Sequence, residues 1–140
     1  LSIAEPCGLD ILQFHGSESA EYCKSFDCRV IKAVRLRDRQ DLKSLPKYND
    51  VTHALLLDTY EPDKLGGTGK TFDWQLAVMA KEYGRIVLAG GLSPQNVAAA
   101  ISTVKPYAVD ASSSLEQSPG IKDHEKIAQF IERVRESARR

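Results

Sequence analysis

Short apolar segments recur along the whole chain and alternate with longer segments of helical period. Runs of four to six mostly apolar residues occupy positions 9–14, 30–35, 54–57, 85–89 and 107–111, and glycine, proline or charged residues bound them. The run at 54–57 shows no alternation, which is typical of a strand that is covered on both faces of a parallel sheet. The pattern therefore predicts five parallel strands.

Helix signals follow each of the five runs. We expect helices from a cap at Ser17 to about residue 26, from residue 38 or 39 to about 45, from a cap at Asp73 to residue 81 or 82, over 95–102, and from about 124 onward. Residues 1–5 are similar to the last turn of a helix, so we expect the chain to begin within a fold. The order of elements predicts right-handed βαβ crossovers.

Two α/β folds fit this order. One is a complete five-stranded doubly wound, flavodoxin-like sheet, and the other is a set of five units of a TIM (β/α)8 barrel. Glycine and serine follow the last two predicted strands. TIM barrels often bind phosphate in the loops after their seventh and eighth strands, so this placement favours the barrel.

Composition and charge exclude several classes of partner. The 140 residues carry 19 basic and 19 acidic side chains, a balance that favours neither nucleic acid nor an anionic membrane. No apolar run approaches the roughly 20 residues that span a bilayer, and the first residues lack signal-peptide features, so we expect a cytoplasmic domain. Cys7, Cys23 and Cys28 lack the spacing of a zinc site, so we expect reduced thiols and no metal.

Candidate chemistry lies where the predicted strands end. Because the carboxyl ends of parallel strands meet at one edge of a sheet, side chains at these positions should share a site. Two adjacent glycines also allow a ligand to approach the backbone closely, and the helix start at Ser93 and Pro94 offers free N–H groups to a phosphate. The candidates are His15, Asp58, Gly90, Gly91, Asp110, Ser112 and Ser113.

Two further features leave alternatives open. The segment GGTGKT at 66–71 imitates the end of a nucleotide-binding P-loop, but that motif requires glycine where Lys64 stands, so an ordinary surface loop is the stronger alternative. Lys32 lies inside the second predicted strand. It needs a carboxylate partner if it is buried, whereas its stem could equally reach solvent.

Seven segments together resemble phosphoribosylanthranilate isomerase of tryptophan biosynthesis. They are LDILQFHG, VIKAVR, LLLDT, GGTGKTFDW, VLAGGLSPQNV, PYAVDASSSLE and GIKDHEKI, in the family's order. The resemblance implies a TIM barrel in which residues 1–140 form the fourth to eighth βα units, without the first three. It also implies an Amadori rearrangement of N-(5-phosphoribosyl)anthranilate to 1-(2-carboxyphenylamino)-1-deoxyribulose 5-phosphate, with no cofactor.

The resemblance also implies a role for each candidate residue. Asp58 matches the general acid that protonates the ribose ring oxygen. His15 matches a histidine near the substrate, and Asp110 matches the residue that faces the anthranilate amine. The other implied substrate-binding residues are Gly67, Gly90, Gly91, Ser112 and Ser113, of which the last four resemble the phosphate cradle.

Two departures from the family pattern bear on activity. Ser114 stands where the family usually has glycine, so we expect the phosphate loop to be shifted. The family's base is a cysteine at the end of the first strand, and Cys7 precedes the fourth strand instead. The chain alone is therefore expected to be inactive and to self-associate or bind the missing units. The alternative is a non-catalytic phosphate- or nucleotide-binding module with a flavodoxin-like sheet.

Overall fold

The structure is a computed structural model that describes residues 4–58 and 74–139. Within these residues the strands are β1 Ile11–Phe14, β2 Arg29–Arg35, β3 Ala54–Asp58, β4 Ile86–Leu88, β5 Ala108–Val109, β6 Glu116–Ser118 and β7 Ile121–Lys122. The α-helices are α1 Ala20–Lys24, α2 Trp74–Ala80, α3 Val97–Val104 and α4 His124–Ala138. Short 3-10 helices are η1 Asp41–Ser44, η2 Pro46–Tyr48, η3 Lys81–Tyr83 and η4 Ser113–Leu115.

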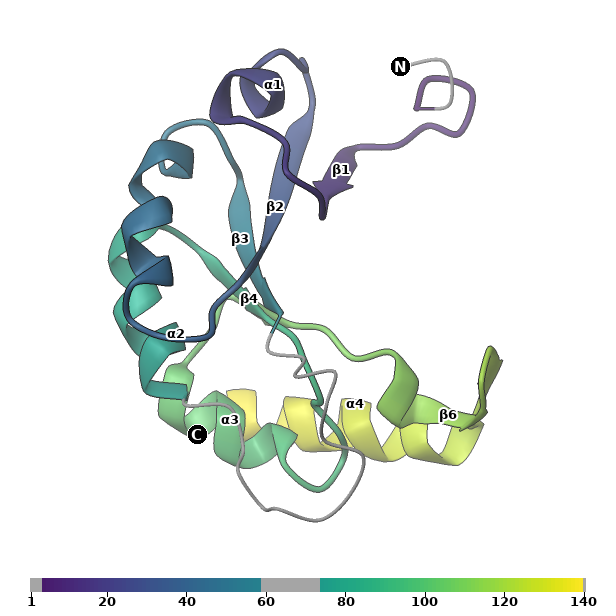
Figure 1. Ribbon diagram of the computed structural model, residues 1–140. Coiled ribbons are helices and arrows are strands. Elements are labelled where there is room, and N and C mark those ends of the chain that lie inside the picture. Colours follow the sequence, from purple (N-terminus) through teal and green to yellow (C-terminus); the bar gives the residue numbers. More distant parts are fainter. Residues whose placement is uncertain (1–3, 59–73, 140) are drawn as a thin grey trace.

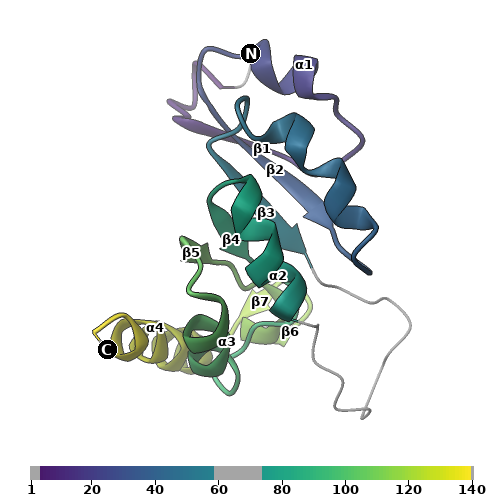
Figure 2. The same ribbon diagram turned by 90° about the vertical axis from the view of Figure 1, so that its left-hand side faces the viewer.

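The main sheet has the strand order β1-β2-β3-β4-β5, and every neighbouring pair is parallel. A doubly wound sheet reverses its order at a switch point and carries helices on both faces. This sheet has no reversal, and α2, α3 and α4 lie on the outer side of its curve (Figures 1 and 2). The architecture is therefore of the TIM-barrel type, and the flavodoxin-like alternative is wrong.

Both faces of the central strand β3 are buried, as its unbroken apolar run predicted. Leu55 and Leu57 belong to the main core between the sheet and the helices, whereas Ala54 and Leu56 belong to a smaller apolar cluster. Since successive side chains of a strand point to opposite faces, this smaller cluster lies on the inner face of the curved sheet. Val87 and Ala89 complete it.

The first predicted helix starts later than expected. Ser19, and not Ser17, is the N-cap of α1, and its Oγ accepts a hydrogen bond of 3.1 Å from the Tyr22 N–H. Ser17 lies between Gly16 and Glu18, whose carboxylate accepts the Gly16 N–H. The prediction at Ser17 was wrong because this loop is bound to its own side chain and cannot begin a helix.

Two other predicted helices have different forms. The helix expected over 38–45 is replaced by the 3-10 helix η1, and a second 3-10 helix, η2, follows with Pro46 at its first position. The helix expected over 95–102 begins at Val97 with Asn96 as N-cap. Asn96 Oδ1 accepts the Ser93 backbone N–H at 2.8 Å, so Ser93 lies in the turn that precedes the helix.

The C-terminal part contains a hairpin that was not predicted. β6 and β7 pair in antiparallel fashion through a turn in which Gly120 has a φ of 81°. The Pro119-Gly120 dipeptide is a known turn signal and could have revealed this hairpin. The last helix begins at His124 as predicted, with Asp123 as its N-cap. Residues 1–3 and the predicted cap Asp73 lie outside the described residues.

Candidate active site

The carboxyl ends of the parallel strands surround a hollow of about 690 Å³. This hollow brings together every strand-end candidate that the structure describes. They are His15 after β1, Asp58 at the end of β3, Gly90 and Gly91 after β4, and Asp110, Ser112 and Ser113 after β5. Gly67 and the GGTGKT segment lie outside the described residues. These residues thus meet at the carboxyl edge of the sheet, as their positions at the strand ends predicted, while the role of each residue stays a prediction.

Asp58 stands beside a cation that the sequence analysis did not single out. It is half-buried at the end of β3, and the register of the sheet places it opposite Arg35 at the end of β2. Both residues line the hollow. Arg35 had a signal in the sequence, because it ends a predicted strand as the other candidates do. A carboxyl group and a guanidinium group therefore face the same space.

The loop after β4 has the backbone conformation that its glycines allow. Gly90 and Gly91 have φ values of 78° and 66°, in the left-handed region that favours glycine. A Cβ added at Gly91 would meet nothing within 4 Å, so conformation and not space selects glycine there. Asn96 Nδ2 donates to the Gly91 carbonyl at 3.0 Å, which fixes the loop against the start of α3.

The serine loop after β5 is joined to the glycine loop. Ser114 Oγ donates a hydrogen bond to the Leu92 carbonyl. Ser114 lies in η4, and Lys105 is the non-glycine residue with positive φ among those described. The backbone of Ser114 thus does not require the freedom of glycine, while the expected shift of the loop relative to the family stays a prediction.

Lys122 of β7 supports the same serine loop from outside. Its Nζ donates to the Ser112 carbonyl at 3.0 Å and to Glu116 Oε1 at 2.8 Å. The hydrogen bond from Lys122 is the main cause that lowers the pKa of the Glu116 carboxyl. The sequence analysis missed this contact, because it depends on the hairpin that brings β6 and β7 together.

Lys32 is buried, with 3% of its surface exposed, and it has a carboxylate partner. Glu18 Oε2 lies 3.2 Å from Lys32 Nζ. The sequence analysis left open whether this lysine is buried or reaches solvent, and the structure shows the first alternative. Side chains two residues apart along a strand point to the same face, so the aliphatic part of Lys32 lies on the same side of β2 as Val30 and Val34. These two valines belong to the main core, on the helix-facing side of the sheet.

The three cysteines contribute no group to the hollow. Cys7 is exposed in the turn before β1, Cys23 is buried in α1, and Cys28 is half-buried, all as free thiols. Burial raises the pKa of the Cys23 thiol. Across the described ranges, no cluster of histidine, cysteine and carboxylate side chains could hold a metal ion. No helix in the same part of the chain is long and apolar enough to span a bilayer.

The chain matches the family model described as N-(5'-phosphoribosyl)anthranilate (PRA) isomerase over residues 1–133. It belongs to this family. The isomerase of Geobacter sp. (strain M21) is 55% identical over 128 residues, which cover 91% of this chain and 62% of that protein. The isomerase of Moorella thermoacetica is 49% identical over 138 residues, covering 98% of this chain and 61% of that protein.

Solved structures of the same family have the same fold. Phosphoribosyl anthranilate isomerase from Thermotoga maritima superimposes with a TM-score of 0.85 at 41% identity, over 96% of this chain and 65% of that one. A family structure in complex with reduced 1-(o-carboxyphenylamino)-1-deoxyribulose 5-phosphate has a TM-score of 0.81 at 35% identity. The match covers 96% of this chain and 63% of that one. The chain thus spans less than two thirds of the length of these relatives.

Proposed function

We propose that this chain forms part of a phosphoribosylanthranilate isomerase that rearranges N-(5-phosphoribosyl)anthranilate to 1-(2-carboxyphenylamino)-1-deoxyribulose 5-phosphate. One observation carries the proposal: Asp58, at the end of β3, shares a hollow with the glycine and serine loops after β4 and β5. An acid and a phosphate-binding edge are two of the parts that this reaction needs on a common surface. The family structure that binds a reduced ribulose 5-phosphate compound supports the same class of substrate.

The five parallel strands are proposed to correspond to the fourth to eighth strands of the barrel, in one domain over residues 1–140. Their sequential order supports this assignment. The positions of the phosphate loops support it as well, because the loops after β4 and β5 would then follow the seventh and eighth strands. The complete enzyme, in which the variants below are tested, is this chain together with the first three βα units of the family's barrel.

The resemblance to the family gives each predicted site residue a proposed role. Asp58 donates a proton to the ribose ring oxygen, which breaks the C1–O bond and leaves a protonated imine between C1 and the anthranilate nitrogen. Loss of the C2 proton then gives an enolamine, which becomes the aminoketose. Asp110 faces the anthranilate amine and His15 lies near the substrate. The substrate phosphate binds through Gly90, Gly91, Ser112 and Ser113, and Gly67 adds a further substrate contact.

The base that takes the C2 proton is proposed to come from outside these 140 residues. Cys7 is exposed before β1, at the amino end of that strand, and it does not line the hollow. We therefore expect the chain alone to turn over no substrate and to gain activity when a polypeptide carrying the first three βα units is added. Appreciable turnover by the isolated chain would contradict this expectation.

Self-association of the isolated chain is part of the same proposal. β1 and β5 are the edge strands of the main sheet, and unpaired strand edges favour pairing with another chain. The inner apolar cluster around Leu56 lies on the face that a closed barrel would cover. Sedimentation of the chain, with and without the added units, measures this directly, and a monomer in both samples would remove this part of the proposal.

The decisive experiment for the function is Asp58→Asn in the complete enzyme. The amide has the shape of the acid but cannot donate its proton, so turnover should fall by about 10²- to 10⁴-fold while substrate affinity stays nearly unchanged. The control is Asp50→Asn, since Asp50 is exposed in the turn before β3 and should leave turnover unchanged. A variant at Asp58 that keeps more than about a tenth of wild-type turnover would remove this residue from the acid's role.

A further inference from the structure

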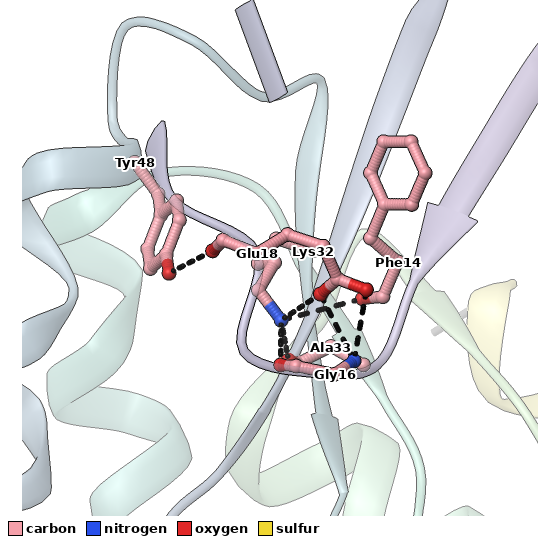
Figure 3. A network of polar contacts seen from close by, with 6 residues as sticks. All are labelled: Phe14, Gly16, Glu18, Lys32, Ala33 and Tyr48. Atoms are coloured by element: carbon pink, nitrogen blue, oxygen red, sulfur yellow. Dashed lines mark hydrogen bonds and ion pairs between the residues drawn. The ribbon is translucent and has the colours of Figure 1, made fainter. Parts of the chain in front are cut away.

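An ion pair between the buried Lys32 and the partly exposed Glu18 holds the loop that carries His15. Lys32 of β2 and Glu18 of the loop after β1 lie at the centre of a polar network that also includes Phe14, Gly16, Ala33 and Tyr48 (Figure 3). His15 itself is exposed at the rim of the hollow. β1 is a short edge strand, so few neighbours fix the segment that follows it.

The ammonium group of Lys32 has no donor left for a substrate. Its Nζ contacts the carbonyls of Gly16 at 2.8 Å, Ala33 at 2.9 Å and Phe14 at 3.5 Å, and Glu18 Oε2 at 3.2 Å. An ammonium group has three N–H donors, so these four acceptors occupy all of them. Although Lys32 lines the hollow, its contacts therefore indicate a structural task toward the loop and not the binding of a phosphate.

These contacts hold both neighbours of His15. Lys32 Nζ binds the carbonyls of Phe14 and Gly16, which precede and follow His15. Glu18 adds a second constraint, because its carboxylate accepts the Gly16 N–H at 2.9 Å. The backbone of His15 is thus fixed from both sides, over a stretch in which Gly16 and Ser17 would otherwise allow wide motion.

A third contact fixes the other side of the loop. The Tyr48 hydroxyl of η2 donates to the Glu18 carbonyl at 2.8 Å, and the Lys32 Nζ lies 5.9 Å from the centre of the Tyr48 ring. Lys32, Glu18 and Tyr48 come from three different segments of the chain and converge on one loop (Figure 3). Charge compensation by Glu18 makes this burial of an ammonium group possible.

We propose that Lys32 and Glu18 are positioning residues, which place His15 at the rim of the active-site hollow. The proposal rests on the proposed function for the substrate contact of His15, but the fixation of the loop stands on the geometry alone. Without the ion pair, the segment from Phe14 to Glu18 loses its anchor to β2, and His15 samples positions away from the substrate. The effect should then appear in KM more than in kcat, because His15 binds the substrate and does not transfer the proton.

The first test measures the amide hydrogen exchange of the loop in the absence of substrate. Glu18→Gln keeps an acceptor for the Gly16 N–H but removes the charge opposite Lys32. Amide hydrogen exchange at Gly16 and His15 in the complete enzyme should become at least about 10-fold faster in this variant. Glu136→Gln is the matched control, because Glu136 pairs with Arg133 on the exposed side of α4 and should leave the exchange unchanged. Unchanged exchange in Glu18→Gln overturns the proposal.

The second test is a double-mutant cycle with His15. Glu18→Gln and Lys32→Gln should each raise KM for phosphoribosylanthranilate by about 10-fold in the complete enzyme, with kcat nearly unchanged. In the His15→Ala background, the same substitutions should raise KM by less than about 2-fold, because the side chain that Lys32 and Glu18 position is gone. Fully additive effects would show that the pair acts on the fold in general, and would overturn the proposal.

The two tests separate this proposal from the proposed function. If the wild-type complete enzyme does not turn over phosphoribosylanthranilate, the proposed function fails, and the exchange measurement alone decides whether the ion pair fixes the loop. If Lys32→Gln does not fold, Glu18→Gln carries both tests, since the Glu18 side chain is 25% exposed and the amide keeps an acceptor for the Lys32 ammonium.

Discussion

Lys122 Nζ lies 3.0 Å from the carbonyl oxygen of Ser112, and this contact joins the β6–β7 hairpin to the loop that follows β5. A second bond from the same nitrogen to Glu116, of 2.8 Å, keeps the lysine in place. The proposed phosphate loop is therefore supported from behind by an element outside the main sheet.

Replacement of Lys122 should weaken phosphate binding without removing the acid. We expect Lys122→Met to raise KM for phosphoribosylanthranilate by about 10-fold in the complete enzyme, because the loop loses a charge-assisted hydrogen bond. Steady-state kinetics should show kcat nearly unchanged. Lys126→Met is the matched control, since Lys126 also bonds Glu116 but has no contact with Ser112 among the described residues. Equal effects of the two variants would contradict this support of the loop.

An anion should bind at the two loops that follow β4 and β5. Crystals of the complete enzyme grown with sulfate or phosphate should show one bound among the backbone N–H groups of Gly90, Gly91 and Ser113. Gly91→Ala should weaken this binding, because its φ of 66° strains any residue with a Cβ. Density only near residues 66–70 would instead support the P-loop interpretation.

The Arg37–Asp41 ion pair should give stability that depends on pH. The hydrogen bond from Arg37 to the Asp41 carboxylate is the main cause that lowers the pKa of Asp41 from 3.8 to about 2. A carboxyl group whose pKa falls on folding stabilises the folded state above its unfolded pKa, and this contribution is lost as the pH falls toward the folded value. The contribution should therefore be complete above about pH 5 and disappear between about pH 4 and 2.

Urea unfolding of the complete enzyme at a series of pH values measures this contribution. The difference in unfolding free energy between wild type and Asp41→Asn should be constant near neutral pH and shrink below about pH 4. Arg37→Gln should remove the larger share of this pH-dependent part but not all of it, because the backbone N–H of residue 37 still donates to Asp41 Oδ2. If the difference in unfolding free energy between wild type and Asp41→Asn stays constant down to about pH 2, this ion pair is not its source.

The helix-facing side of β3 should dominate stability. Leu57 is fully buried in the main core, so Leu57→Ala should lower the free energy of unfolding by about 2–5 kcal/mol. Leu9→Ala is the matched control, because Leu9 is 47% exposed and should change stability by less than about 0.5 kcal/mol. Denaturant midpoints of the two variants provide the comparison. Similar losses of unfolding free energy in both variants would show that the helix-facing side of β3 does not dominate stability.

The sequence by itself determined the strands of the main sheet and the edge at which the site lies. The unbroken apolar run at 54–57 reported that both faces of β3 are covered, which is a local property of that segment. Asp58 and Asp110 were found because they stand at or just beyond the ends of such runs, and parallel strands bring those ends together. Family motifs added the implied roles, which the composition and spacing could not supply.

Only the tertiary structure decided which residues meet across loops. The bond from Lys32 to Glu18 and the bond from Ser114 to Leu92 join positions 14 and 22 residues apart, and each depends on the exact course of a loop. The sheet order excluded a doubly wound fold, although both folds share the same alternation of strands and helices. The N-cap positions Ser19 and Asn96 likewise depended on contacts within each loop, since Ser19 Oγ accepts the Tyr22 N–H of α1 whereas Asn96 Oδ1 accepts the Ser93 N–H in the turn before α3.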